Sequence, residues 1–180
     1  GTEILFAQHV GDDLVPTWPS DGLQVNPNAI LGQFNPKMVT SADGYLYYFW
    51  TEDIFFVGLR LFAQKYDITG AAQWAEGGLE IGPPDISGDT YVTSAHAMAD
   101  TSVIYIWESE TVEGTKTYIS KLMQDGSTLW TESVTEAAGS QRNSIAAYNP
   151  ESDMVTVGWE DHRSISVSSV DLYAVSVDTD

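Results

Sequence analysis

The sequence predicts an all-β protein, and more narrowly a β-propeller-like repeat of four-stranded antiparallel blades. Two observations predict this fold: a short signature recurs along the 180 residues at a nearly constant step, and short strand-like segments fill each step. A period of this size is typical of stacked units that cannot bury their apolar faces alone. We expect about three blades, forming a partial propeller or one completed by oligomerisation.

The signature is clearest at Leu61-Phe62-Ala63-Gln64, which repeats residues 5–8 letter for letter. Looser copies begin at Tyr118 and Leu172, so the step is about 56 residues. Tryptophan repeats at a similar step, and the six tryptophans form two series: Trp18, Trp74 and Trp130 follow the signature, whereas Trp50, Trp107 and Trp159 precede it. The regularity favours a propeller over a β-sandwich, which predicts no such period.

Each step contains four candidate strands. Aromatic or β-branched runs at 46–50, 103–107 and 154–159 are each preceded by another candidate strand, at 37–42, 91–97 and 144–148. Turn residues such as Asp43-Gly44 separate them. We expect one domain over 1–180, with units at about 5–60, 61–117 and 118–171 and a final strand at 172–178. The strands then group as two, four, four and three, from the first end of the chain to the last.

Two stretches carry a resemblance to a known kind of repeat. Trp159-Glu160-Asp161-His162-Arg163, followed by Leu172-Tyr173-Ala174, resembles the W-E-D-x-R and Y-A-Q-x-x-D-x-x-G-x-x-x-W repeats of secreted bacterial β-propellers. Residues 61–74 match the second half of that pattern most fully. Trp107-Glu108-Ser109 lacks the Asp and the Arg. The resemblance implies a propeller in an extracellular or cell-surface protein, and it implies little about activity.

Composition limits the partners. The chain has 26 acidic and 7 basic residues, a formal net charge of −19, and no cysteine. Such a surface repels phosphate backbones and anionic membranes, so we expect no nucleic-acid partner and no membrane insertion. Neither a disulfide nor a thiolate metal site can form. We expect a secreted protein whose export signal is not in this chain, and partners that are other copies, other surface proteins or a glycan.

No cofactor is predicted, and Ca²⁺ is the one metal that the sequence favours. The three histidines are unclustered, which argues against a transition-metal site. Carboxylates near turns could hold Ca²⁺ without an EF-hand loop, and the candidates are Asp12, Asp13, Asp85 and Asp89. No catalytic residue is assigned, although acidic pairs such as Glu52-Asp53 could converge across blades in a glycan-active enzyme.

The tryptophans have two interpretations. Repeated tryptophans in a propeller usually bury large apolar area between blades, and we expect this structural role for Trp18, Trp74 and Trp130. Trp74 and Trp130 should be mostly buried at equivalent places. The second series, Trp50, Trp107 and Trp159, could instead stack on sugar rings.

Three functions follow in order of preference. The first is a non-enzymatic structural or adhesive module, not an enzyme, that self-associates or presents repeated faces. The second is a carbohydrate-binding, lectin-like propeller, and the third is a glycan-active enzyme.

Overall fold

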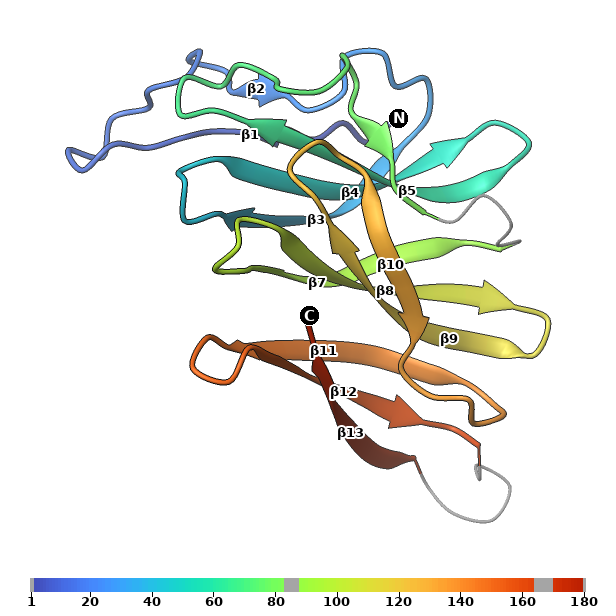
Figure 1. Ribbon diagram of the computed structural model, residues 1–180. Helices are drawn as coiled ribbons and strands as arrows, with labels where there is room; N and C mark the ends of the chain where they lie inside the picture. The colour runs from blue at the N-terminus through green and yellow to red at the C-terminus, as the bar shows by residue number, and fades with distance from the viewer. Residues whose placement is uncertain (1, 83–87, 164–169, 180) are drawn as a thin grey trace.

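The chain folds into a row of antiparallel sheets that fan out side by side as propeller blades, as the computed structural model in Figure 1 shows. It describes residues 2–82, 88–163 and 170–179. Thirteen strands lie within these residues, in sheets of two, four, four and three strands. The all-β propeller class and the predicted grouping of strands are both confirmed. Within the described residues, no helix could cross a membrane.

The two-stranded sheet is a half-blade made of β1 (Phe6–Ala7) and β2 (Leu23–Gln24). Blade 1 follows, with the strands β3 (Gln33–Thr40), β4 (Leu46–Ile54), β5 (Gly58–Tyr66) and β6 (Leu79–Glu80) in sequential order.

Blades 2 and 3 repeat this meander. Blade 2 contains β7 (Thr90–Ala97), β8 (Val103–Thr111), β9 (Gly114–Leu122) and β10 (Thr128–Ser133). Blade 3 contains β11 (Gln141–Asn149), β12 (Met154–Asp161) and β13 (Asp171–Asp178). The first strands of the blades, β3, β7 and β11, lie next to one another and form the inner edge of the fan.

The core lies between blades, because both faces of β4 and β8, the second strands of blades 1 and 2, are covered. Tyr47 and Phe49 of β4 pack with Tyr105 of β8, and the Phe49 and Tyr105 rings stack with centroids 5.6 Å apart. The alternate side chains Tyr48 and Trp50 pack against the half-blade instead. Strands buried on both faces read as continuous apolar runs, which is why the second-strand segments were so visible in the sequence.

Candidate functional site

The three ligand-stacking candidates lie in the core. Trp50 and Trp107 are 0% exposed, so their rings offer no face to a ligand, whereas Trp159 is 5% exposed and borders a hollow on blade 3. The physical reason is the alternation of the strand, which turns each indole toward the preceding blade. The stacking expectation is corrected for Trp50 and Trp107, which take the wedge role expected of the other series.

A carboxylate two residues after the tryptophan stabilises two of these indoles. Trp50 Nε1 donates to Glu52 Oε2 at 3.0 Å, and Trp159 Nε1 donates to Asp161 Oδ2 at 3.1 Å. Blade 2 has Ser109 at this position, and there Trp107 donates to Ser120 Oγ at 2.9 Å. Both carboxylates are buried. We infer that the acid of the Trp-x-acid pattern serves the fold.

The other tryptophan series joins blades from outside the central strands. Trp18 is buried, whereas Trp74 and Trp130 are partly buried and pack against the two inter-blade cores. Trp18 and Trp74 are equivalent, because each backbone amide donates to the glutamine of its signature, Gln8 or Gln64. The structural role fits this series, although Trp74 and Trp130 are less buried than expected.

The calcium candidates do not converge in the described residues. Asp12 and Asp13 lie on an exposed turn, where Asp13 Oδ1 accepts the amide of Val15 at 3.1 Å. Asp89 lies far along the chain and accepts the amide of Leu59 at 2.9 Å. Asp85 lies outside the described residues. Across the described part of the chain, no three His, Cys, Asp or Glu side chains gather as a metal site would require.

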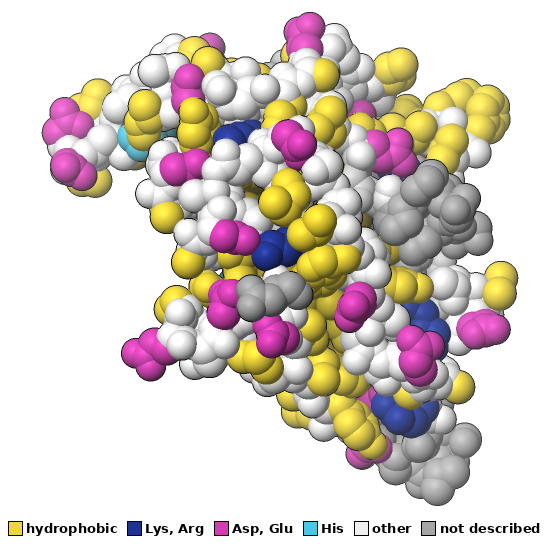
Figure 2. Space-filling model, in the orientation of Figure 1, with side chains coloured by type: hydrophobic (Ala, Val, Ile, Leu, Met, Phe, Trp, Pro, Cys, Tyr) yellow, Lys and Arg dark blue, Asp and Glu magenta, His cyan; other side chains and the backbone are white. Residues whose placement is uncertain are grey.

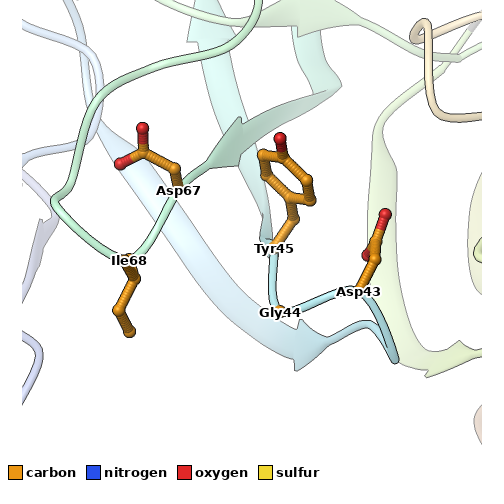
Figure 3. Close-up of a pocket in the computed structure, with 5 residues that line it drawn as sticks. All are labelled: Asp43, Gly44, Tyr45, Asp67 and Ile68. Atoms are coloured by element: carbon orange, nitrogen blue, oxygen red, sulfur yellow. The ribbon is translucent and has the colours of Figure 1, made fainter.

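A pocket of about 360 Å³ brings together side chains that the sequence did not single out. Its lining comes from two turns of blade 1, the β3–β4 turn with Asp43, Gly44 and Tyr45, and the β5–β6 turn with Asp67 and Ile68. In Figure 3 the Tyr45 ring stands between the carboxylates of Asp43 and Asp67, and all three side chains project the same way. Antiparallel pairing explains the meeting, because alternate hairpin turns share one end of a sheet.

Local hydrogen bonds fix both carboxylates. Asp43 Oδ1 accepts Ser41 Oγ at 2.5 Å, and Asp43 Oδ2 accepts Gln124 Nε2 of blade 2 at 3.2 Å. Asp67 Oδ1 accepts the hydroxyl of Thr69 at 2.6 Å and the amide of Ala71 at 3.0 Å. The Thr69 hydroxyl and then the Ala71 amide lower the pKa of Asp67, so this carboxyl stays ionised at neutral pH.

A buried lysine lies against the aromatic ring of this pocket. Lys65 is 6% exposed, and its Nζ lies 4.0 Å from the centroid of the Tyr45 ring and 5.5 Å from that of Tyr47. Its counterpart in blade 2, Lys121, instead forms an ion pair of 3.0 Å with Asp100. Burial, followed by the charge of Asp43 and by Tyr45, raises the pKa of Tyr47 to about 12. The pocket therefore combines carboxylate acceptors and an aromatic ring, and the ammonium group of Lys65 supports that ring.

No family model matches the sequence, and no characterised protein is similar to it in sequence. Among solved structures, the fold is similar to that of an endo-arabinase from Bacteroides thetaiotaomicron, with 14% identity and a TM-score of 0.49. The match covers 78% of this chain and 54% of that chain, so this chain spans about half the length of its neighbour. At this level of likeness the comparison concerns the fold.

The neighbour is named as an endo-arabinase, and this finding runs against two sequence expectations. The expected non-enzymatic structural or adhesive module and the expectation that the protein is not an enzyme are therefore withdrawn. Both expectations were drawn from the repeats, and repeats indicate the fold. Functional residues lie mostly on the turns between strands, which the repeat pattern does not describe. Association between copies and an extracellular location stay predictions.

Proposed function

We propose that this chain acts on glycans, with the pocket around Tyr45 as a saccharide subsite of a glycan-active enzyme. The observation that carries the proposal is the convergence of one aromatic ring and two carboxylates, drawn from two turns, in a pocket of about 360 Å³. Ligand sites of this kind hold an apolar surface and a few fixed polar groups.

Each group has a role suited to a sugar. The hydroxyls of a sugar donate short, strong hydrogen bonds to ionised carboxylates, which Asp43 and Asp67 offer at the rim. The Tyr45 ring supplies an aromatic surface for the apolar C–H groups of a pyranose or furanose ring. Lys65 lies against that ring from its buried position, with Nζ 4.0 Å from the ring centroid, and its charge offsets part of the local negative charge.

The same two carboxylates suit glycosidic bond cleavage. Enzymes of that class use two acidic groups that flank the bond, one of them ionised while the reaction begins. Asp67 is held ionised by its donors, so its part would be to activate water or to stabilise positive charge at the sugar. Asp43 is the second carboxyl group at the pocket and, once it has taken up a proton from solvent, would donate that proton to the leaving-group oxygen as the glycosidic bond breaks. The proton that Asp67 takes from the attacking water then returns to solvent.

A panel of neutral polysaccharides tests this function directly. Arabinan, xylan, galactan and a β-glucan are incubated with the protein, and released reducing ends are measured alongside binding by isothermal calorimetry. We expect at least one to bind, with Tyr45→Ala weakening that binding about tenfold. Asp67→Asn should abolish turnover while leaving binding measurable.

The control is Asp125→Asn, which changes a comparable turn of blade 2 where Asp125 accepts Ser127 at 2.6 Å. This variant should bind and cleave like the unchanged protein. Binding that survives Tyr45→Ala, or a panel with neither binding nor cleavage, would rule out the pocket as a saccharide subsite.

A further inference from the structure

A second hollow, of about 390 Å³, opens along the inner edge of the fan and spans all three blades. Its polar lining comes from β3, β7 and β11: Asn35, Lys37, Tyr91, Thr93, Asn143 and Ser144. We call it the axial groove. It lies on the first strands of the blades, whereas the Tyr45 pocket lies on turns of blade 1.

A repeated bulge shapes the axial groove. The pairing of the first strand with the second shifts register between Phe34 and Lys37 in blade 1, and again between Arg142 and Ile145 in blade 3. Within these bulges Asn35 and Asn143 adopt left-handed backbone conformations, with φ of 52° and 53°. Asparagine tolerates this region better than most residues. The bulge thus places an amide side chain at the groove in two blades.

Lys37 stands out among the cations of this acidic chain. Of the seven basic residues, the other six each contact a carboxylate, a carbonyl, a hydroxyl or an aromatic ring, and they are Arg60, Lys65, Lys116, Lys121, Arg142 and Arg163. Among the described residues, Lys37 has no ion pair or hydrogen-bond partner for its ammonium group. It is partly exposed, so its charge faces the groove while water still reaches it.

The lining around Lys37 is polar and contains no Asp or Glu, although the chain carries 26 acidic residues. The amide of Asn143 is already engaged, because its Nδ2 donates to Glu160 Oε2 at 2.9 Å, which leaves the amide of Asn35 as the donor beside Lys37. Burial, and then the charges of Glu110 and Asp89, raise the pKa of Tyr91, so its phenol keeps its proton. The hydroxyls of Thr93 and Ser144 lie 2.9 Å apart across blades 2 and 3, which ties the two walls together.

We propose that the axial groove binds the carboxylate of an organic acid, with Lys37 as the counter-ion and Asn35 as a neutral donor beside it. An ammonium group without an acidic partner, beside amide and hydroxyl groups, favours an anion over a cation at this place, against the repulsion from the net charge of −19 on the chain. The ligand could be an acidic sugar or a small organic acid, since both present the same carboxylate. This site is independent of the saccharide subsite proposed at Tyr45.

Calorimetric titration with glucuronate, glucose and lactate separates the alternatives. Glucuronate should bind and glucose should not bind in the groove. Lys37→Gln should weaken glucuronate binding about tenfold, whereas Lys37→Arg should retain it. Raising the salt concentration should weaken binding to the unchanged protein more than to Lys37→Gln. Lactate binding as tightly as glucuronate would assign recognition to the carboxylate alone.

Two controls keep this test separate from the Tyr45 pocket. Tyr45→Ala should leave glucuronate binding unchanged, and Lys37→Gln should leave the binding of neutral polysaccharides unchanged. The thermal unfolding midpoint of Lys37→Gln should stay close to that of the unchanged protein, because among the described residues the Lys37 ammonium group has no ion pair or hydrogen bond to lose and Gln keeps part of the aliphatic stem. Absence of glucuronate binding at millimolar concentration, or binding that Lys37→Gln does not alter, would overturn the proposal.

Discussion

The indole nitrogen of Trp18 donates a 3.0 Å hydrogen bond to the carbonyl oxygen of Ile68, fifty residues further along the chain. Trp74 repeats the contact one blade later, donating to the carbonyl of Gln124 at 3.2 Å across the same separation. Each bond runs from one blade to the β-turn of the next, so the blades are joined at their outer turns as well as through their cores. This contact explains why the first tryptophan series keeps its period.

The turn that receives Trp18 should not tolerate a larger residue at Gly70. Gly70 has φ of 84°, and an added Cβ would lie 3.2 Å from the indole of Trp18. Gly44 has the same φ with nothing within 4 Å, so Gly44→Ala measures backbone strain alone. We expect Gly44→Ala to cost about 1 kcal/mol of unfolding free energy and Gly70→Ala about 2 kcal/mol in urea titrations. Equal losses would mean that the indole moves aside freely.

The buried carboxylate of Glu52 should matter more for stability than that of Asp53, the less buried next residue. It accepts hydrogen bonds from Trp50 Nε1 at 3.0 Å, from Asn26 Nδ2 at 2.9 Å and from Gln33 Nε2 at 3.3 Å. Glu52→Gln replaces one carboxylate oxygen with an NH2 group, which cannot accept hydrogen bonds from these three donors. We expect a loss of about 2 kcal/mol, measured by denaturant unfolding. The control Asp53→Asn, on the less buried next residue, should change stability by less than about 0.5 kcal/mol.

Acid should break the ion pair between Asp161 and Arg163. The side-chain hydrogen bond from Arg163, at 2.7 Å from Nε, is the largest cause that lowers the pKa of Asp161, far below its ordinary value of 3.8. A lowered pKa in the folded state gives stability that is complete above the ordinary value and is lost as the pH falls through the folded value.

We therefore expect Asp161→Asn to destabilise the protein by about 2 kcal/mol at neutral pH. It should also flatten the fall in stability below about pH 4, as followed by thermal unfolding between pH 2 and pH 7. Glu160→Gln alters the adjacent carboxylate and should keep the slope of the unchanged protein. A slope that Asp161→Asn leaves intact would place the acid sensitivity elsewhere.

The blades could be predicted from the sequence because the features that build them are periodic. Runs such as 46–50 and 103–107 are buried on both faces, and the signature at Leu61 recurs with its turn. Even the uneven grouping of strands followed from aligning the repeats. The faces of Trp50 and Trp107 were misjudged, because a period shows that positions are equivalent and not whether they point to a neighbour or to solvent.

The two candidate sites could not be predicted in this way. The Tyr45 pocket joins turns that are far apart in sequence, and the axial groove depends on bulges that shift the register of β3 and β11. A bulge leaves only a weak signal, here an asparagine at corresponding places, Asn35 and Asn143. The sequence also does not show that Lys37 lacks an ion pair or hydrogen-bond partner among the described residues.

Loss of the hydroxyl group should lower the unfolding free energy at one of two buried tyrosines on adjacent blades and not at the other. Tyr105 and Tyr47 are both 0% exposed, but Tyr105 donates to the carbonyl of Ile81 at 2.9 Å, whereas the buried hydroxyl of Tyr47 has no hydrogen-bond partner among the residues that the structure describes. A buried hydroxyl without a partner costs desolvation energy that nothing offsets. We expect Tyr105→Phe to lower the unfolding free energy by about 1 kcal/mol and Tyr47→Phe to leave it unchanged or raise it. Urea titrations of both variants, at constant slope, measure the difference. A loss of similar size in both variants would show that the Tyr47 hydroxyl has a partner in solution, such as a bound water.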